Sequence, residues 1–104
     1  MILTTLDTVP GRVIAAHYGV VSGSTVRSKH IGRDLIAGIK SLFGGELRGY
    51  TELLEEAREE AIRRMVASAR KSDANAILNI RLATSSVANG AAELFAYGTA
   101  VKLE

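Results

Sequence analysis

The residues that could do chemistry are few, and the first pair is His30 and Asp34. They stand four residues apart, so they share one face if a helix begins a turn before Asp34, and together they could bind an ion such as zinc. Two ligands do not make a site, and a third would have to come from Glu46 or another subunit. The simpler interpretation is a loop histidine beside Lys29 and a carboxylate at a helix start. The other histidine, His17, lies among apolar residues and is interpreted as a hydrogen-bonded core or interface histidine.

Arg58 is the most informative charged residue, because helical spacing places it inside the apolar stripe of a predicted helix. An isolated buried charge is very costly. We therefore expect its guanidinium to pair with a carboxylate, and Asp34 is the first candidate, within the subunit or across an interface. A second interpretation is an anion site, in which a glycine-rich segment and Arg58 hold a phosphate or a carboxylate. A third is that Arg58 reaches solvent along its aliphatic stem. The glycines of that segment are Gly44, Gly45 and Gly49.

Composition excludes several classes of function. The 13 basic and 11 acidic residues leave a net charge of +2, too small an excess for a nucleic-acid footprint. The chain has no cysteine, so disulfides, thiolate metal sites and thiol catalysis are excluded. The glycines near residue 45 lack the lysine of a phosphate loop, and Gly23-Ser24 lacks the flanks of a nucleophile elbow. We predict no catalytic residue and no nucleic-acid partner, and the sequence identifies no cofactor.

The acidic run at residues 52–60 is interpreted as a solvated helix face, balanced by Arg63 and Arg64 through pairs four residues apart. No apolar run approaches the ~20 residues of a membrane span. Residues 1–11 lack the basic head and apolar stretch of a signal peptide. We expect a single cytoplasmic domain over residues 1–104, with no membrane partner.

Hydrophobic periodicity predicts the elements that must position these residues. Strands are expected at residues 2–5 and 12–26, the second one bent near Gly19 or at residues 22–24. A short helix is predicted at residues 34–43 and a long one at 51–71, separated by a glycine loop that ends at Gly49. Alternation then predicts a strand at residues 76–86, with Leu78, Ile80 and Leu82 on one face. A hairpin at Asn89-Gly90 leads to a last strand at residues 92–103.

This order predicts an α+β fold with a largely antiparallel, curved sheet packed on one long and one short helix. One long helix covers one face of such a sheet, and a face that meets water should be polar. Neither face of the long strand fits water, and the second face of the last strand is small and nearly uncharged. We therefore predict a homo-oligomer in which neighbouring copies cover the sheet. The alternative is that the short helix at residues 34–43 covers the second face. That second face of the last strand comprises Leu94, Ala96, Gly98 and Ala100.

Short motifs in a fixed order resemble those of the YbjQ family of small prokaryotic proteins, over essentially the whole chain. The resemblance implies a dodecin-like subunit, assembled as a ring that is most often a pentamer. The family carries a heavy-metal-binding label but no established activity. Two residues depart from its pattern, Asp73, where glycine is usual, and the polar Asn79 within a strand. The matching motifs are Val20-Val21-Ser22-Gly23, Arg33-Asp34, Gly44-Gly45, Gly49-Tyr50, Glu56-Ala57-Arg58, Ala74-Asn75-Ala76 and Gly98-Thr99-Ala100-Val101.

The leading hypothesis is a non-catalytic homo-oligomeric binding or scaffold protein. Its ligand, a small anion or a metal ion, would lie at a subunit interface near Asp34, Arg58 and the glycine loop. Metal binding through His30 and Asp34 is the second hypothesis. An enzyme is the third, and it would need His17 or His30 as its group titrating near neutrality.

Overall fold

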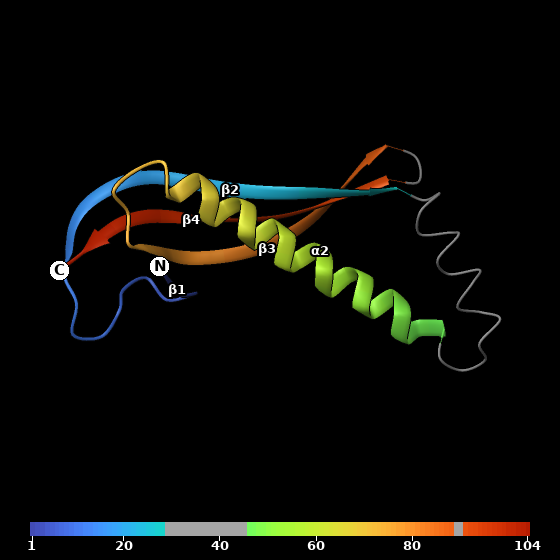
Figure 1. Ribbon diagram of the computed structural model, residues 1–104, viewed down its shortest axis with the longest axis horizontal. Helices are drawn as coiled ribbons and strands as arrows, with labels where there is room; N and C mark the ends of the chain where they lie inside the picture. Colours follow the sequence, from blue (N-terminus) through green and yellow to red (C-terminus); the bar gives the residue numbers. More distant parts are fainter. Residues whose placement is uncertain (29–45, 89–90) are drawn as a thin grey trace.

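A computed structural model of the chain describes residues 1–28, 46–88 and 91–104. One helix packs on a four-stranded mixed sheet of order β1-β3-β4-β2 (Figure 1), which confirms the α+β class. β1 runs parallel to β3, and the other two pairings are antiparallel. The short helix predicted at residues 34–43 and the hairpin turn at 89–90 lie outside the described residues. The elements are β1 (Ile2–Leu3), β2 (Ile14–Ser28), α2 (Glu46–Ala69), β3 (Ala76–Ala88) and β4 (Ala91–Leu103).

The predicted start of the long helix is wrong by five residues. α2 begins at Glu46 rather than at Thr51, so Gly49 is helical and does not belong to a loop. A glycine inside a helix costs only about 1 kcal/mol, and a glutamate in the first turn interacts favourably with the positive end of the helix dipole. α2, the helix of the described residues, is long enough to span a bilayer but is not apolar enough to cross one.

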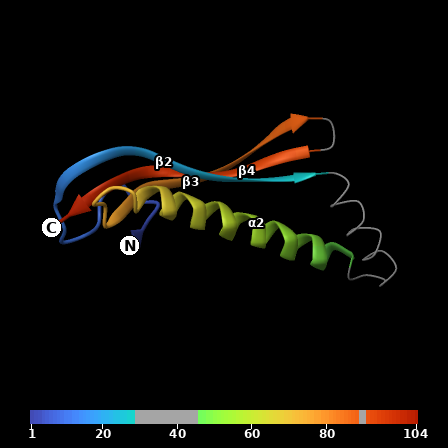
Figure 2. The same cartoon turned by 45° about the horizontal axis from the view of Figure 1, so that its top comes forward.

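β2 bends at Gly19, one of the two positions expected from the sequence. Gly19 has a φ of 95°, a conformation that residues with a side chain rarely adopt. The pairing of β2 with β4 shifts register between His17 and Gly19, as in a β-bulge. Beyond this bend β2 runs straight beside β4, as Figures 1 and 2 show.

The predicted alternation in β3 is wrong, because a bulge interrupts the strand. The β3–β4 register shifts between Leu78 and Arg81, and Asn79 has a φ of 55°, which asparagine tolerates better than most residues. Leu78 therefore faces away from α2, whereas Ile80 packs in the core beneath it. Leu82 lies on the helix side, opposite Ala96, yet is 43% exposed. The polar residue in the strand, Asn79, thus occupies a backbone position that suits it.

The sheet has a helix side and a back face (Figure 2). Contrary to expectation, Ala96 and Ala100 of β4 face α2 and are fully buried. A second cluster lies on the back face at the opposite end of β4 from the hairpin, where Ile2 and Val9 of the N-terminal segment cover it. The helix-side core contains Ala61, Met65, Ala69, Ile77, Ile80, Ala96 and Ala100, and the back-face cluster contains Ala76, Leu78, Val101 and Leu103.

Small residues bring α2 into contact with the backbone of β2. A Cβ added at Gly23 would overlap the carbonyl oxygen of Ala61 and the amide nitrogen of Met65. Ala57 and Ala61, one turn apart, are fully buried at this contact. Nearby, the buried Thr25 hydroxyl donates a hydrogen bond to the Ala57 carbonyl, at 3.4 Å. The helix axis is therefore held at a separation that only glycine on β2 permits.

Asn75 joins the end of α2 to the C-terminal end of β4. Its Nδ2 donates to the Leu103 carbonyl at 3.0 Å, and its Oδ1 accepts from the Leu103 amide at 2.7 Å. The side chain thereby pairs with Leu103 as a neighbouring strand would. This accounts structurally for the Ala74-Asn75-Ala76 motif, since no residue without an amide can replace both bonds.

Replacing Gly23 with alanine should destabilise the protein by about 2 kcal/mol or more, because the added methyl meets helix backbone, which cannot rotate away. Denaturant unfolding at a fixed protein concentration measures the change. Ser22→Ala, at the neighbouring exposed position of β2, is the matched control and should stay within about 0.5 kcal/mol. Equal effects of the two changes would contradict the close α2–β2 contact.

Candidate functional site

The residues predicted to form a site divide between the described and undescribed parts of the chain. Asp34, His30, Gly44 and Gly45 lie outside the described residues. Among the described ones, the structure places Gly49 and Arg58 on α2. The pairing of Arg58 with Asp34, and the metal pair of His30 and Asp34, therefore stay predictions.

Arg58 lies on the flank of α2, one residue beyond the buried Ala57. Leu54 and Ile62, one turn before and after it, are half-buried like Arg58 itself, and Ile62 packs against the core. Within residues 1–28, 46–88 and 91–104 its guanidinium has no hydrogen-bond or ion-pair partner. The prediction that Arg58 lies within the apolar stripe of α2 is thus confirmed in part, because Arg58 lies at the edge of the stripe rather than at its centre. A half-buried cation in this state can receive a carboxylate or another anion.

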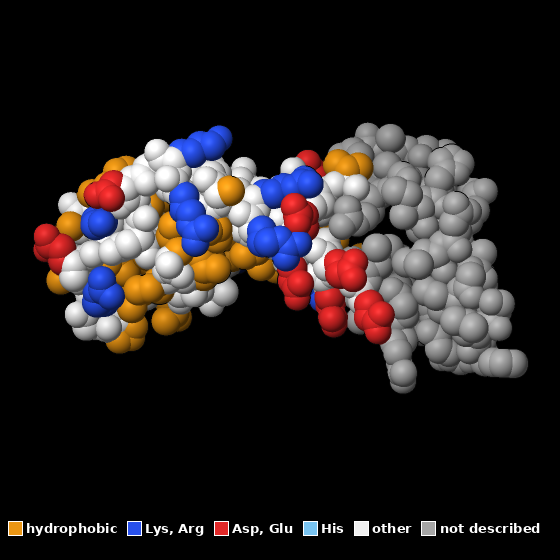
Figure 3. All heavy atoms as spheres, in the orientation of Figure 1, with side chains coloured by type: hydrophobic (Ala, Val, Ile, Leu, Met, Phe, Trp, Pro, Cys, Tyr) orange, Lys and Arg blue, Asp and Glu red, His pale blue; other side chains and the backbone are white. Residues whose placement is uncertain are grey.

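Acidic side chains gather on the N-terminal half of α2 (Figure 3), as the sequence predicted. Glu52, Glu55, Glu56 and Glu59 are exposed. The described residues contain no group of three histidine, aspartate or glutamate side chains close enough to hold a metal ion. This acidic surface is therefore solvated charge rather than a ligand set.

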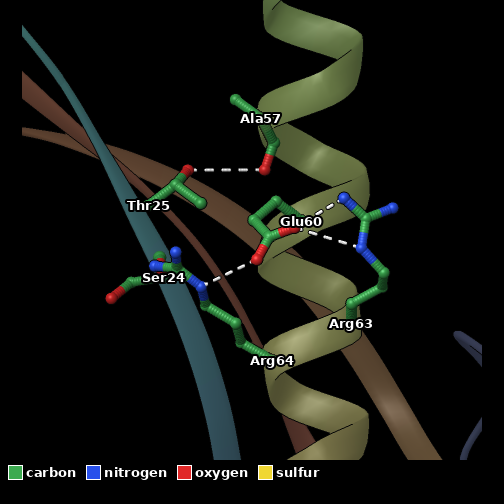
Figure 4. Close-up of polar contacts among 6 residues, drawn as sticks. All are labelled: Ser24, Thr25, Ala57, Glu60, Arg63 and Arg64. Atoms are coloured by element: carbon green, nitrogen blue, oxygen red, sulfur yellow. Dashed lines mark hydrogen bonds and ion pairs between the residues drawn. The ribbon is translucent and has the colours of Figure 1, made fainter.

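Glu60 is the exception, because two arginines bind its carboxylate (Figure 4). Arg63 donates to Oε2 from Nε at 3.1 Å, and Arg64 donates to Oε1 from Nε at 3.0 Å. The Arg64 Nη1 also donates to the Ser24 carbonyl of β2 at 2.5 Å. The hydrogen bonds from Arg63 and then Arg64 lower the pKa of Glu60 below its ordinary value of 4.5. The network confirms the predicted pairing and, through Ser24, ties α2 to β2, a contact that the sequence could not reveal.

His17 is exposed on β2, so its predicted place in the core is wrong. It lies on β2, an outer strand of the sheet, directly before the register shift at Gly19. An interface role for His17 stays a prediction. The sequence does not distinguish a buried His17 from an exposed one, because the neighbours of His17 on both sides are apolar.

The residues present do not fit a soft heavy-metal ion. Such ions prefer thiolate and thioether ligands, and the chain has no cysteine and two methionines. Of these methionines, Met65 is fully buried in the helix-side core. An imidazole and carboxylate site at His30 and Asp34 remains the metal hypothesis for which the chain has residues.

The fold and its few polar contacts define a small α+β protein with one helix on a four-stranded sheet. The family model described as "Putative heavy-metal-binding", YbjQ, matches residues 1–104, and the chain belongs to this family. A UPF0145 protein from Hahella chejuensis is 64% identical over 104 residues, covering 100% of both chains. A UPF0145 protein from Vibrio parahaemolyticus is 59% identical, covering 99% of this chain and 98% of its own. One from Thermus thermophilus is 57% identical, covering 100% and 91%.

A solved structure supports the fold. A protein of unknown function of the DUF74 family, from Pediococcus pentosaceus, superposes with a TM-score of 0.64 and 18% identity. The match covers 100% of this chain and 98% of the other. At this level of identity the likeness concerns the fold alone.

Glu60→Gln should remove a pH-dependent contribution to stability. Because the folded pKa of Glu60 is depressed, its ion pairs stabilise the fold above the unfolded pKa and are lost as the pH falls through the folded pKa. The stability advantage of the wild type over the variant should therefore shrink between neutral pH and pH 4 and below. Denaturant unfolding across this range measures it, with the exposed Glu59→Gln as control. An advantage that is constant with pH would contradict the network.

Arg58→Ala should destabilise the assembled protein by about 2 kcal/mol, because the carboxylate or other anion that is predicted to pair with this half-buried arginine would lose its partner. Arg70→Ala, at an exposed position just beyond the same helix, is the control and should change little. Both are measured by unfolding at one protein concentration. A loss below about 0.5 kcal/mol for Arg58→Ala would make it an ordinary surface residue.

Proposed function

We propose that the protein is a non-catalytic homo-oligomer that acts as a small-ligand-binding or scaffold protein. The observation that carries the proposal is the amount of apolar sheet surface that one subunit leaves exposed. Val20 is 80% exposed, Val13 66% and Tyr97 39%, and all three lie in or beside the sheet. Exposed apolar patches of this kind mark association surfaces in soluble proteins.

Arg58 supports a ligand site at the subunit interface. Its half-buried guanidinium has no partner among the described residues, and a carboxylate or phosphate group would satisfy it. In this proposal Asp34, Gly44 and Gly45 lie nearby, and either Asp34 of a neighbouring copy or a small anion completes the pair. The ring of five subunits that the family resemblance implies is the assembly we favour.

Metal binding is the second candidate, and the description of the family favours it. The ion would be bound by His30 and Asp34 with a third ligand from elsewhere, which suits a borderline ion such as zinc. Metal analysis of protein purified without a histidine tag, before and after loading, distinguishes the candidates. Stoichiometric metal that His30→Ala abolishes would favour this alternative, and substoichiometric zinc, copper and nickel would remove it.

Native mass spectrometry of the protein taken from cell extract tests the leading proposal. We expect a species of about five times the 11.1-kDa subunit mass, together with any retained anion. Denaturing mass spectrometry of the same sample controls for covalent additions. A single subunit that stays monomeric as the protein concentration is raised would contradict the proposal.

A further inference from the structure

The N-terminal strap, here residues 1–9, lies along the outer edge of β3 (Figure 1) and pairs with it through main-chain hydrogen bonds. The amide of Ile2 donates to the carbonyl of Asn75 at 2.9 Å, and the amide of Thr4 donates to the carbonyl of Ile77 at 3.1 Å. Main-chain bonds of this kind can form with an extended segment of almost any sequence. Residues 75–80 are therefore an edge at which an extended segment is already bound.

The bulge of β3 supplies the other half of this pairing. Neighbouring amides of a regular strand point to opposite edges, but the amides of Asn79 and Ile80 both point to the strap. Asn79 donates to the carbonyl of Leu6 at 2.9 Å. Ile80 donates to the carbonyl of Thr4 at 3.0 Å. The positive φ of Asn79 and the register shift of β3 at this point allow both bonds, so the edge presents two adjacent donors to the segment that lies along it.

Arg81 also binds the main chain of the strap. Its Nη1 donates to the carbonyl of Thr5 at 3.0 Å. Every residue carries a carbonyl, so this contact, like the four main-chain bonds, does not require the strap's own sequence. The side chains that are selective are those of Ile2 and Val9, because they pack on the back-face cluster.

The side chains of the strap contribute little to holding it in place. Of residues 1–9, six are exposed and three are half-buried. Leu3 is 43% exposed and Leu6 56%. Segments with few buried apolar contacts open at a smaller free energy than the whole fold. We therefore expect the strap to open before the sheet and α2 unfold.

The strap adjoins a turn and an anchor that can stay in place when it opens. Arg12 Nε donates to the carbonyl of Glu104 at 2.8 Å, and Val13 and Glu104 exchange two main-chain hydrogen bonds. These bonds hold residues 12–13 against the end of the chain that follows β4. Between this anchor and the strap lies Pro10-Gly11, where Gly11 has a φ of 77°, a conformation that glycine adopts readily.

We propose that residues 75–80 form a strand-addition site, which the strap occupies within the chain and leaves when an extended segment of another protein binds. Such a segment needs amides free to donate at the positions of Ile2 and Thr4, and an aliphatic side chain at the position of Ile2 to cover the back-face cluster. The strap is then an autoinhibitory contact. The site lies within one subunit, so it does not depend on the proposed homo-oligomer.

Hydrogen exchange of the full chain, followed by NMR, tests whether the strap opens as a unit. The four amides that join the strap to β3 should exchange together, at least ~100-fold faster than amides of the helix-side core. Ile2→Asp should raise the exchange of the Asn79 and Ile80 amides at least ~10-fold further, because it places a charge against the back-face cluster. Leu3→Asp, at the neighbouring exposed position, is the matched control and should leave their exchange unchanged.

A peptide with the sequence of residues 1–9 tests whether the site accepts a segment from outside. The peptide carries a fluorophore, and anisotropy measures its binding to the full-length protein. We expect it to bind the Ile2→Asp variant at least ~10-fold more tightly than the wild type, whose own strap competes at high effective concentration. The same peptide with Thr4→Pro, which cannot donate at that position, should not bind. Circular dichroism checks that Ile2→Asp is folded, and Ile2→Ala replaces it otherwise.

Three results would overturn the proposal. The first is exchange of the strap's amides only together with those of the helix-side core. The second is a peptide that binds neither variant at position 2, or that binds equally well with proline at position 4. The third is protection of the Asn79 and Ile80 amides that rises with protein concentration, because the bound strap would then come from a neighbouring copy.

Discussion

The close contact between α2 and β2 is the constraint on which the rest of the structure depends. At Gly23 the strand backbone touches the helix backbone at Ala61 and Met65, so no larger residue can occupy that position. Buried alanines on α2 contribute to this close contact, and a second glycine, Gly98 of β4, leaves room for the side chains of Ile77 and Ile80 on the adjacent β3. Polar contacts from Thr25 and Arg64 then fix the helix along β2. Packing of this kind depends on small side chains rather than on large apolar ones.

Because α2 packs closely along β2 and β4, it leaves other parts of the sheet uncovered. One helix is too narrow for a four-stranded sheet, and its displacement toward β2 exposes the helix side of β3, while the N-terminal segment covers only one end of the back face. The apolar residues that remain in water are therefore a direct consequence of where α2 lies. They are also the reason for regarding the subunit as part of an assembly, since burying them stabilises the folded chain.

The family description and the chemistry of this chain point in different directions. A heavy-metal site calls for soft ligands, and this sequence has no cysteine. Among the described residues no three histidine, aspartate or glutamate side chains lie close enough to hold a metal ion, and Glu60 is bound to two arginines. Arg58 is a more distinctive feature, because a half-buried cation attracts anions rather than metal ions. For this member of the YbjQ family, charge and burial favour an anion or a carboxylate of a neighbouring copy.

The sequence by itself determined the α+β class, the long helix, the bend at Gly19 and the pairing of Glu60 with Arg64, because periodicity, glycine and helical spacing act over a few residues. The tertiary structure alone decided which face of each strand meets α2. Both faces of β4 are apolar, so the small residues on one face could pack against a helix or against another copy. The contact of α2 with Gly23 on the adjacent β2 determines that this face of β4 meets the helix. The bulge at Asn79 reverses the alternation within β3, which a strict period of two cannot anticipate. Likewise α2 extends back through Gly49 to Glu46, because a helix already propagating tolerates one glycine that, judged alone, indicates a loop.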